Sequence, residues 1–163
     1  MPVGGLMVAA MGKSKRFVEI VAQLMSRWGY THTDGVIYAH LLLSERPLTI
    51  SELAEATRLS RSSVSVSLSR LTRDYLVTYR KEGKTKYFSA VPAFLEKFLQ
   101  QPRDILDREV RPLKEIVGRL METAGGEEKA RFETILTDLS ALECVLEKII
   151  ELEEKESECI DAR

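Results

Sequence analysis

The sequence predicts a mainly α-helical fold with one small β-hairpin, and three observations support this class. Apolar residues recur at intervals of three and four over most of the 163 residues, which is the periodicity of helices. Only one pair of short β-prone runs occurs, on either side of Gly83. The C-terminal part, residues 127–156, has one uninterrupted helical pattern. A chain of this length has room for one domain, or for one domain with a helical extension.

The N-terminal half begins with two predicted helices. Residues 13–30 have apolar side chains with a 3.6-residue period and predict an amphipathic helix, whereas residues 34–44 are apolar on most faces and predict a buried one. Pro47 ends the second helix. Residues 1–12, MPVGGLMVAAMG, are expected to form a flexible N-terminal tail. Their apolar run precedes the basic residues, which is the wrong order for a secretory signal.

A third, short helix is predicted in TISELAEAT, residues 49–57. Thr49 or Ser51 is placed to cap its N-terminus, with Glu52 or Glu55 accepting a hydrogen bond from the backbone of the cap residue.

The next segment, SRSSVSVSLSRLTRD at residues 60–74, has six serines in its first ten positions. The alternation of serine with Val64, Val66 and Leu68 is that of a strand, but the final RLTRD has no period of two. A helix that starts after Ser60, a residue well suited to cap it, explains the whole segment better. It places four apolar side chains on one side: Val64, Leu68, Leu71 and Tyr75.

Two short β-prone runs follow, at residues 76–80 and 86–90. They flank Glu82-Gly83-Lys84-Thr85, a sequence that favours a hairpin turn centred on Gly83.

Beyond Pro92 only helical patterns occur, and we assign residues 92–163 to a helical dimerisation region. Pro102 and Pro112 interrupt the first part, and Gly125-Gly126 ends it. The last helix has apolar residues spaced by three and four, as in a coiled-coil seam. This seam could pack within the chain, but a small domain offers it too little partner surface, so we expect it to pair two subunits. Its residues are Phe132, Ile135, Leu139, Leu142, Leu146 and Ile149.

The order of helix, helix, short helix, tight turn, helix and hairpin is that of a winged helix-turn-helix domain, which we assign to residues 13–91. In this arrangement the second helix of the pair lies in the DNA major groove, where small polar side chains let its backbone approach the base edges. Serine hydroxyls suit phosphates and bases, and arginine suits phosphates and guanine. The predicted DNA contacts of the recognition helix are Ser60, Arg61, Ser62, Ser63, Ser65, Val66, Ser69, Arg70 and Arg73. Those of the wing are Arg80, Lys81, Gly83, Lys84 and Lys86.

The charge of the chain is distributed unevenly. Through Ala90 there are 13 Lys and Arg against 7 Asp and Glu, whereas the remainder has 11 against 18. A basic front half indicates that this half meets a polyanion, although chance clustering of charge is the alternative. Because each neutralised phosphate releases counterions, the basic side chains of helix and wing predict binding that weakens steeply with salt.

The segment from residue 35 to residue 91 resembles the MarR-type winged-helix regulators, and in particular their GbsR-like branch. The motifs that carry the resemblance are Ile37-Tyr38 followed by Leu41–Ser44, Pro47-Leu48, the serine-rich stretch Ser60–Ser69, and Gly83-Lys84 before Tyr87-Phe88. The likeness extends over residues 15–100. It implies a homodimeric transcription factor whose long terminal helices pair the subunits. Tyr75 departs from the pattern, since relatives usually have glycine after the recognition helix.

Other functional classes have little support. The two histidines, His32 and His40, lie in a capping loop and on an apolar helix, so no Cys/His spacing predicts a metal site. No glycine-rich phosphate loop or nucleophile elbow is present. We therefore predict no enzymatic activity, no metal and no cofactor. Cys144 and Cys159 are expected to be inert thiols in a reducing, cytoplasmic setting, and no apolar run approaches the roughly 18 residues of a membrane span.

The sequence thus predicts a DNA-binding regulator that acts as a homodimer on a (pseudo)palindromic operator, with double-stranded DNA and a second copy of itself as partners. If a small-molecule effector exists, we expect it between residues 92–122 and the DNA-binding domain, with Leu106 and Met121 as candidate lining residues, although core packing explains both more simply. Two alternatives stay open: a winged-helix protein-protein interaction subunit that does not bind DNA, and a disordered phosphorylation segment at the serine run.

Overall fold

A computed structural model describes the backbone of residues 3–155 and the side chains of residue 12 and residues 14–155. The chain forms two compact units, an N-terminal unit of residues 1–93 and a C-terminal unit of residues 94–163. Within the described residues, no helix combines the length and the apolar character that crossing a membrane requires.

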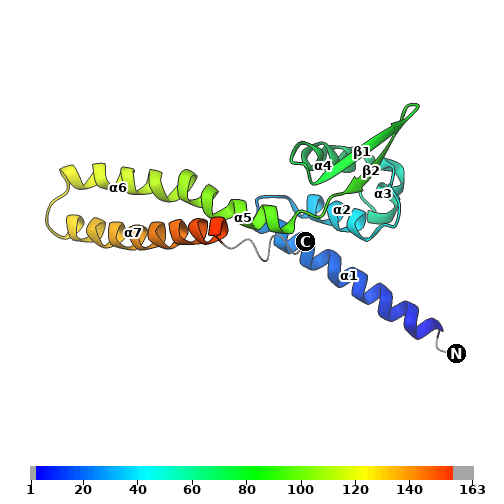
Figure 1. Cartoon of the computed structure of the whole chain (residues 1–163), viewed down its shortest axis with the longest axis horizontal. Coiled ribbons are helices and arrows are strands. Elements are labelled where there is room, and N and C mark those ends of the chain that lie inside the picture. Colours follow the sequence, from blue (N-terminus) through cyan, green and yellow to red (C-terminus); the bar gives the residue numbers. More distant parts are fainter. Residues whose placement is uncertain (1–2, 156–163) are drawn as a thin grey trace. The chain divides into compact units, whose positions relative to one another are not determined.

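The N-terminal unit contains four helices followed by a β-hairpin (Figure 1), which confirms the predicted fold class. The segment expected to be a flexible tail overlaps the first helix, which begins at Val3, while residues 1 and 2 lie outside the described part. The elements are α1 (Val3–Arg27), α2 (His32–Leu43), α3 (Ile50–Thr57), α4 (Arg61–Arg73), β1 (Val77–Glu82) and β2 (Thr85–Ala90).

Side-chain caps fix where α2, α3 and α4 begin. Thr31 and Asp34 form a capping box at α2, and of the two cap candidates predicted for α3, Thr49 with Glu52 forms the box. Ser60 caps α4 by accepting a hydrogen bond from the amide of Ser63, at 3.1 Å. Each cap satisfies backbone N–H groups that a helix start otherwise leaves without partners.

The end of α4 differs from the prediction. Tyr75 is not on the buried side of the helix: the helix ends at Arg73, and Tyr75 is 84% exposed with a φ of 61°. The amide of Leu76 donates to the carbonyl of Leu71, and that of Tyr75 to Thr72, which is the Schellman pattern of helix termination. The left-handed residue turns the chain, so Leu76 takes the buried position against Leu71. Glycine usually occupies this place because it adopts positive φ without strain.

The wing is an antiparallel pair of strands that a third segment extends. Val77 is opposite Ala90 and Glu82 opposite Thr85, with Gly83 in the turn at a φ of 61°. Leu48, between α2 and α3, exchanges two backbone hydrogen bonds with Phe88, at 2.9 and 2.8 Å. At the base of the wing, the Tyr38 hydroxyl donates to the carbonyl of Val91 at 2.6 Å. The wing is therefore anchored to the helical core at two points.

The core of the N-terminal unit lies among α1, α2, α4 and the base of the wing. Helices α1 and α2 approach so closely that a Cβ on Gly35 would lie 2.5 Å from the Cα of Ala22. The buried core residues are Val21, Met25, Ile37, Tyr38, Ala39, Leu41, Leu53, Val64, Leu68, Leu71, Leu76, Val77 and Phe88.

The C-terminal unit consists of α5 (Phe94–Ile105), a π-helical segment η1 (Leu106–Val110), α6 (Arg111–Thr123) and α7 (Gly126–Lys155). Figure 1 shows α6 and α7 as an antiparallel helical hairpin. Of the two prolines that interrupt this region, Pro112 lies in the first turn of α6 and Pro102 lies inside α5. Leu106, Val110 and Leu146 form a small buried cluster.

Candidate nucleic-acid interface

The outward side of α4 carries a row of small side chains. Val64, Leu68 and Leu71 face the core, and the same helical period leaves most of the serines exposed. Val66 is 57% exposed and is the one large apolar side chain among them in this helix. The exposed predicted contacts of the helix are Ser60, Arg61, Ser62, Ser63, Ser65, Val66, Ser69 and Arg73. This face is slim enough for the backbone of a helix to approach base edges in a major groove.

Three serine hydroxyls of this segment have partners within the protein. Ser60 donates to the hydroxyl of Ser63 at 2.9 Å, in addition to capping α4. Ser67, which is not among the predicted contacts, is buried and hydrogen-bonds to Asp34. The serine run therefore faces outward except at Ser67.

The structure places Arg70 on an internal partner. Its guanidinium donates from Nη1 to both carboxylate oxygens of Asp34, at 2.7 and 2.6 Å. Asp34 is fully buried. Burial raises the pKa of its carboxyl group, but hydrogen bonds from Ser67, Arg70 and Thr31 outweigh burial and bring the pKa below its ordinary value. Asp34 is thus a charged carboxylate at neutral pH.

The other two arginines of α4 are exposed. Arg73 forms an ion pair with Asp74, at 2.9 Å between Nε and Oδ1, and Asp74 also accepts a hydrogen bond from the Tyr30 hydroxyl at 2.8 Å. Burial, followed by this hydrogen bond, raises the pKa of Tyr30. Arg61, at the N-terminus of the helix, forms no ion pair with any described residue.

The wing carries its cations on both faces. Arg80 lies over the ring of Tyr87, 5.4 Å from its centroid, and pairs with Glu82 at 3.4 Å. Lys86 lies over the ring of Tyr79 at 4.5 Å. Such contacts with aromatic rings orient a long basic side chain without neutralising it. All five predicted wing residues are exposed: Arg80, Lys81, Gly83, Lys84 and Lys86.

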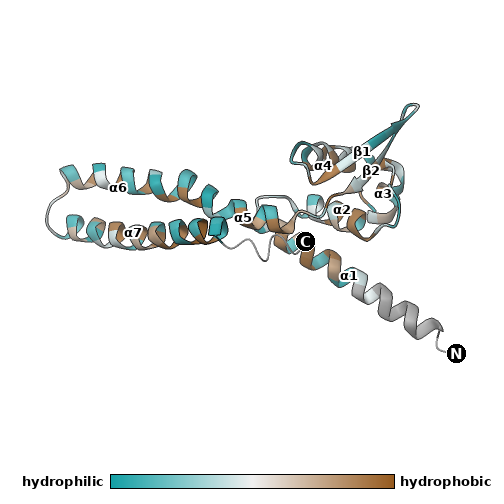
Figure 2. Ribbon diagram, viewed as in Figure 1, coloured by the Kyte–Doolittle hydropathy of each residue, from teal (hydrophilic) through white to brown (hydrophobic). Residues whose placement is uncertain are grey.

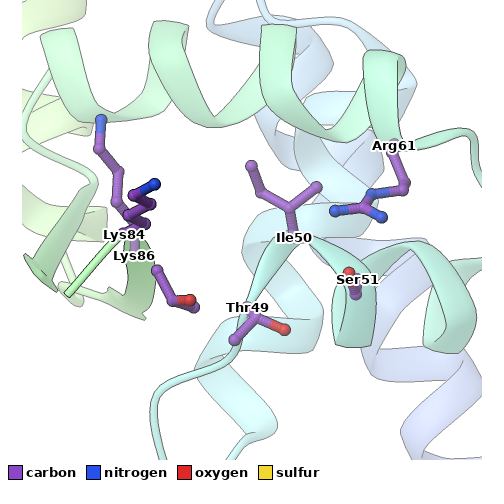
Figure 3. A pocket seen from close by; sticks show the side chains of 7 residues that line it. Thr49, Ile50, Ser51, Arg61, Lys84 and Lys86 are labelled. Carbon is purple, nitrogen blue, oxygen red and sulfur yellow. The ribbon is translucent and has the colours of Figure 1, made fainter. Parts of the chain in front are cut away.

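Arg61 and two wing lysines surround one recess. Figure 3 shows Arg61 from α4 on one side and Lys84 and Lys86 from the wing on the other. The recess has a volume of about 240 Å³ and is also lined by Thr49, Ile50, Ser51 and Thr85. No acidic side chain of the described part forms an ion pair with these three cations. Three unneutralised cations with three hydroxyls make a surface suited to a phosphate group.

A second groove separates α4 from the wing. Its volume is about 320 Å³, and Ser65, Ser69, Arg73 and Lys86 are among its lining residues. The hydroxyl oxygen of Thr72, which also lines it, is buried and has no hydrogen-bond partner among the described residues. The polar side chains of helix and wing therefore border a continuous concave surface.

Sequence reasoning missed Thr49 and Ser51 at this surface, and the buried Asp34 and Ser67 behind it. The sequence predicts Thr49 and Ser51 only as caps, although the start of α3 also lines the recess beside α4. The burial of Ser67 follows from its spacing, since it lies four residues before Leu71 on the inward side. Nothing in the sequence connects Asp34 with a residue 36 positions away.

The six residues predicted to pair subunits divide into two stripes on α7. Leu146 is buried, and Phe132 and Leu139 are half-buried. Ile135, Leu142 and Ile149, also seven residues apart, are 44%, 42% and 38% exposed. The sequence leaves both packing within the chain and pairing of subunits open. The covered stripe packs within the chain, and the exposed stripe is the part of the seam to which the second alternative still applies.

The remaining described residues that the sequence singled out do not line the recess or the groove. The Nδ1 of His40 lies 2.8 Å from the carbonyl of Val36, so this histidine is satisfied inside its own helix. Cys144 is an exposed free thiol, and Cys159 lies outside the described residues. Leu106 is buried in the small cluster of the C-terminal unit.

Comparisons with known proteins agree with this architecture. Residues 40–79 match the model of the bacterial regulatory protein family arsR. A crystal structure of a transcriptional regulator aligns with a TM-score of 0.52 at 17% identity, covering 88% of this chain and 99% of that one. TrmBL2, described as an archaeal chromatin protein with a novel mode of DNA binding, aligns with a TM-score of 0.54 at 23% identity, covering 67% of this chain and 40% of TrmBL2. No curated protein matches significantly. The chain therefore has the winged-helix fold of transcriptional regulators.

Proposed function

We propose that this protein is a transcriptional regulator that binds double-stranded DNA sequence-specifically in the cytoplasm, as a homodimer on a (pseudo)palindromic operator. Helix α4 enters the major groove, and the wing contacts the flanking phosphates. Recognition rests on Ser62, Ser63, Ser65, Val66 and Ser69, and backbone binding on Arg61 and the wing cations. Within the winged-helix regulators we propose the GbsR-like branch, on the motifs of residues 35–91.

The recess between α4 and the wing is the observation that carries this proposal. Arg61, Lys84 and Lys86 converge on it without an acidic partner among the described residues. A protein-binding module gains nothing from three unneutralised cations beside a slim polar helix, whereas a phosphate backbone neutralises them and releases its counterions. Figure 2 shows the outer part of the wing as hydrophilic.

The exposed stripe of α7 supports the homodimer. Ile135, Leu142 and Ile149 recur every seven residues and remain accessible after α6 has covered the neighbouring stripe. Helix α6 exposes Leu113, Ile116 and Leu120 in the same way. A second copy offers each stripe an identical apolar partner, as two-fold assembly requires. Two recognition helices in such a dimer meet half-sites about 34 Å apart, one turn of DNA.

A small-molecule effector of unknown chemistry would act by changing the distance between the two recognition helices.

The test is selection of bound sequences from a random pool of double-stranded DNA, followed by titration of the selected site against salt. We expect an inverted repeat with half-sites about ten base pairs apart, and an affinity that falls steeply as salt rises. Substituting Lys84→Ala and Lys86→Ala together should weaken binding and reduce the salt slope by about one for each phosphate that the variant no longer neutralises.

Lys129→Ala with Lys148→Ala is the matched control, because both lysines are exposed on α7. It removes the same charge and should leave the slope unchanged. If no sequence is retained above background, and the two double-lysine variants behave alike, the result would instead support a winged-helix protein-protein interaction subunit.

A further inference from the structure

The start of α2 and the second half of α4 are joined by directional polar contacts around one buried carboxylate. Arg70 donates to both oxygens of Asp34, at 2.7 and 2.6 Å, and Ser67 hydrogen-bonds to the same group. The amide of Thr31 donates to Oδ2 at 3.0 Å, and the Thr31 hydroxyl accepts from the amide of Asp34 at 3.1 Å. We call this set of residues the Asp34 network: Thr31, Asp34, Ser67 and Arg70.

This network lies beside an apolar contact that is not directional. Val64, Leu68 and Leu71 bury α4 in the core, but apolar packing tolerates small rotations of a helix better than hydrogen bonds do. Ser67 and Arg70 are one turn apart on the edge of that face. The two hydrogen bonds from Arg70 to the buried carboxylate are directional, so they resist rotation of the helix about its own axis.

The angle of α4 determines where its outward side chains lie. Side-chain atoms are about 5 to 6 Å from a helix axis, so a rotation of about 20° moves them by about 2 Å. A hydrogen bond to a base edge spans a range of only about 0.5 Å. A rotation of this size therefore removes base contacts while the helix stays folded and in the groove.

Arg70 cannot serve DNA and the network at once. A buried ionised carboxylate requires its partners, and Asp34 is fully buried. A guanidinium that moved to a phosphate would leave this charge without its only cationic partner among the described residues. Arg61, exposed on the same helix, forms no ion pair with a described residue.

We propose that Asp34 and Arg70 are positioning residues of the recognition helix: they fix its rotation, and Arg70 contributes to sequence discrimination without contacting DNA. The inference rests on the proposed DNA-binding function. It changes the role of one residue that the sequence assigned to the DNA surface, and it assigns a role to a carboxylate that would otherwise only repel DNA.

The first test compares Arg70→Gln with Arg61→Gln on the selected operator. Both remove one positive charge from α4. Arg61→Gln should reduce the slope of log affinity against log salt by about two in a homodimer, one contact per subunit, and weaken specific and random DNA alike. Arg70→Gln should leave the slope unchanged and lower the ratio of specific to random affinity by about tenfold.

Asp34→Asn provides a test in which the two explanations predict opposite signs. Removing a negative charge near bound DNA should raise affinity if only electrostatics matters. A positioning role predicts a lower specific affinity and an unchanged affinity for random DNA. Because both residues act through one contact, Arg70→Gln should add little to Asp34→Asn in the double variant.

The outcomes separate the two proposals. Wild-type protein that binds no DNA overturns both. Wild-type protein that binds, with Arg70→Gln reducing the slope as much as Arg61→Gln does, overturns the positioning role and leaves the DNA-binding function standing. If Asp34→Asn does not fold, the comparison of the two arginine variants still decides. Equal losses on specific and random DNA for Arg70→Gln, at an unchanged slope, also count against positioning.

Discussion

The two units bury their apolar side chains to very different extents. In the N-terminal unit a contiguous set of residues from α1, α2, α4 and the wing is buried, and Met25, Ile37, Tyr38 and Leu71 are fully inaccessible. In the C-terminal unit the buried cluster is confined to Leu106, Val110 and Leu146 with half-buried neighbours. Both α6 and α7 leave an apolar stripe exposed. The N-terminal unit closes its core by itself, whereas the C-terminal unit keeps part of its apolar surface exposed.

The largest effect is expected from charging the exposed stripe of α7. Leu142→Asp together with Ile149→Asp would bury two unpaired carboxylates in each half of a dimer interface, and should weaken dimerisation about a thousandfold, or about 4 kcal/mol. Sedimentation velocity over a range of protein concentrations measures this change. Ser140→Asp is the control, since it lies on nearly the opposite side of the same helix and is exposed. If the wild-type protein is already monomeric at micromolar concentration, the exposed stripe of the C-terminal unit does not pair subunits, and this comparison of the two units fails.

A core truncation tests the other half of the comparison. Leu68 is 1% exposed in the core of the N-terminal unit, and Leu68→Ala should lower the free energy of unfolding by about 3 kcal/mol at every protein concentration. Ile116→Ala, on the exposed stripe of α6, should reduce thermal stability only at concentrations where the wild-type protein associates. It should change nothing at low concentration, where association no longer contributes. Thermal melts at several concentrations distinguish the two. A concentration-independent loss for Ile116→Ala would mean that the C-terminal unit is stabilised within one chain.

Periodicity predicted most of the elements because the core of the N-terminal unit is built from regularly spaced apolar residues. The apolar pattern did not mark Ser67, which is buried, apart from Ser65, which is exposed, because a serine carries no apolar signal; only its spacing of four residues from Leu71 places Ser67 on the inward side. Periodicity also assigned all six apolar residues of the α7 seam to one face, and did not separate the covered stripe from the exposed one. The contacts of Asp34 with Arg70, and of Leu48 with Phe88, join residues that are far apart in the sequence. Such pairs depend on the packing of whole elements, so local patterns contain no information about them.

The helix end at Tyr75 offers a smaller, stabilising change to the N-terminal unit. A non-glycine residue with a φ of 61° costs about 1 kcal/mol relative to glycine. Because the Tyr75 side chain is exposed and contributes little to the core, Tyr75→Gly should raise the free energy of unfolding by roughly that amount. Tyr75→Ala keeps the left-handed strain and should not. Denaturant titration checks the pair, and equal stability of both variants would show that the side chain, and not the backbone, sets the cost.

An isolated apolar side chain behaves differently from a stripe. Val66 is exposed among serines on α4, and it is placed to contact the methyl group of a thymine. Replacing one thymine of the selected operator by uracil, which lacks this methyl, should cost about 1 kcal/mol, or about fivefold in affinity. With Val66→Ser the same replacement should change nothing. A loss of equal size in both proteins would place the thymine against another residue.

The smallest effects are expected from surface carboxylates, and here the two units should behave alike. Hydrogen bonding from Arg46, followed by that from the Thr49 backbone, lowers the pKa of Glu52 to about 2. A hydrogen bond from Lys114 lowers the pKa of Glu143, which joins α7 to α6. A depressed folded-state pKa contributes stability above the unfolded value of about 4.3, and this contribution disappears as pH falls through the folded value. Glu52 therefore loses its contribution to stability as the pH falls from about 4.3 to about 2. Carboxyl NMR titration should give a midpoint near 2 for Glu52. In Arg46→Gln the midpoint should rise toward the ordinary value and stop below it, because the hydrogen bond from the Thr49 backbone remains. An ordinary midpoint for Glu52 in the wild-type protein would mean that its ion pair does not persist in solution.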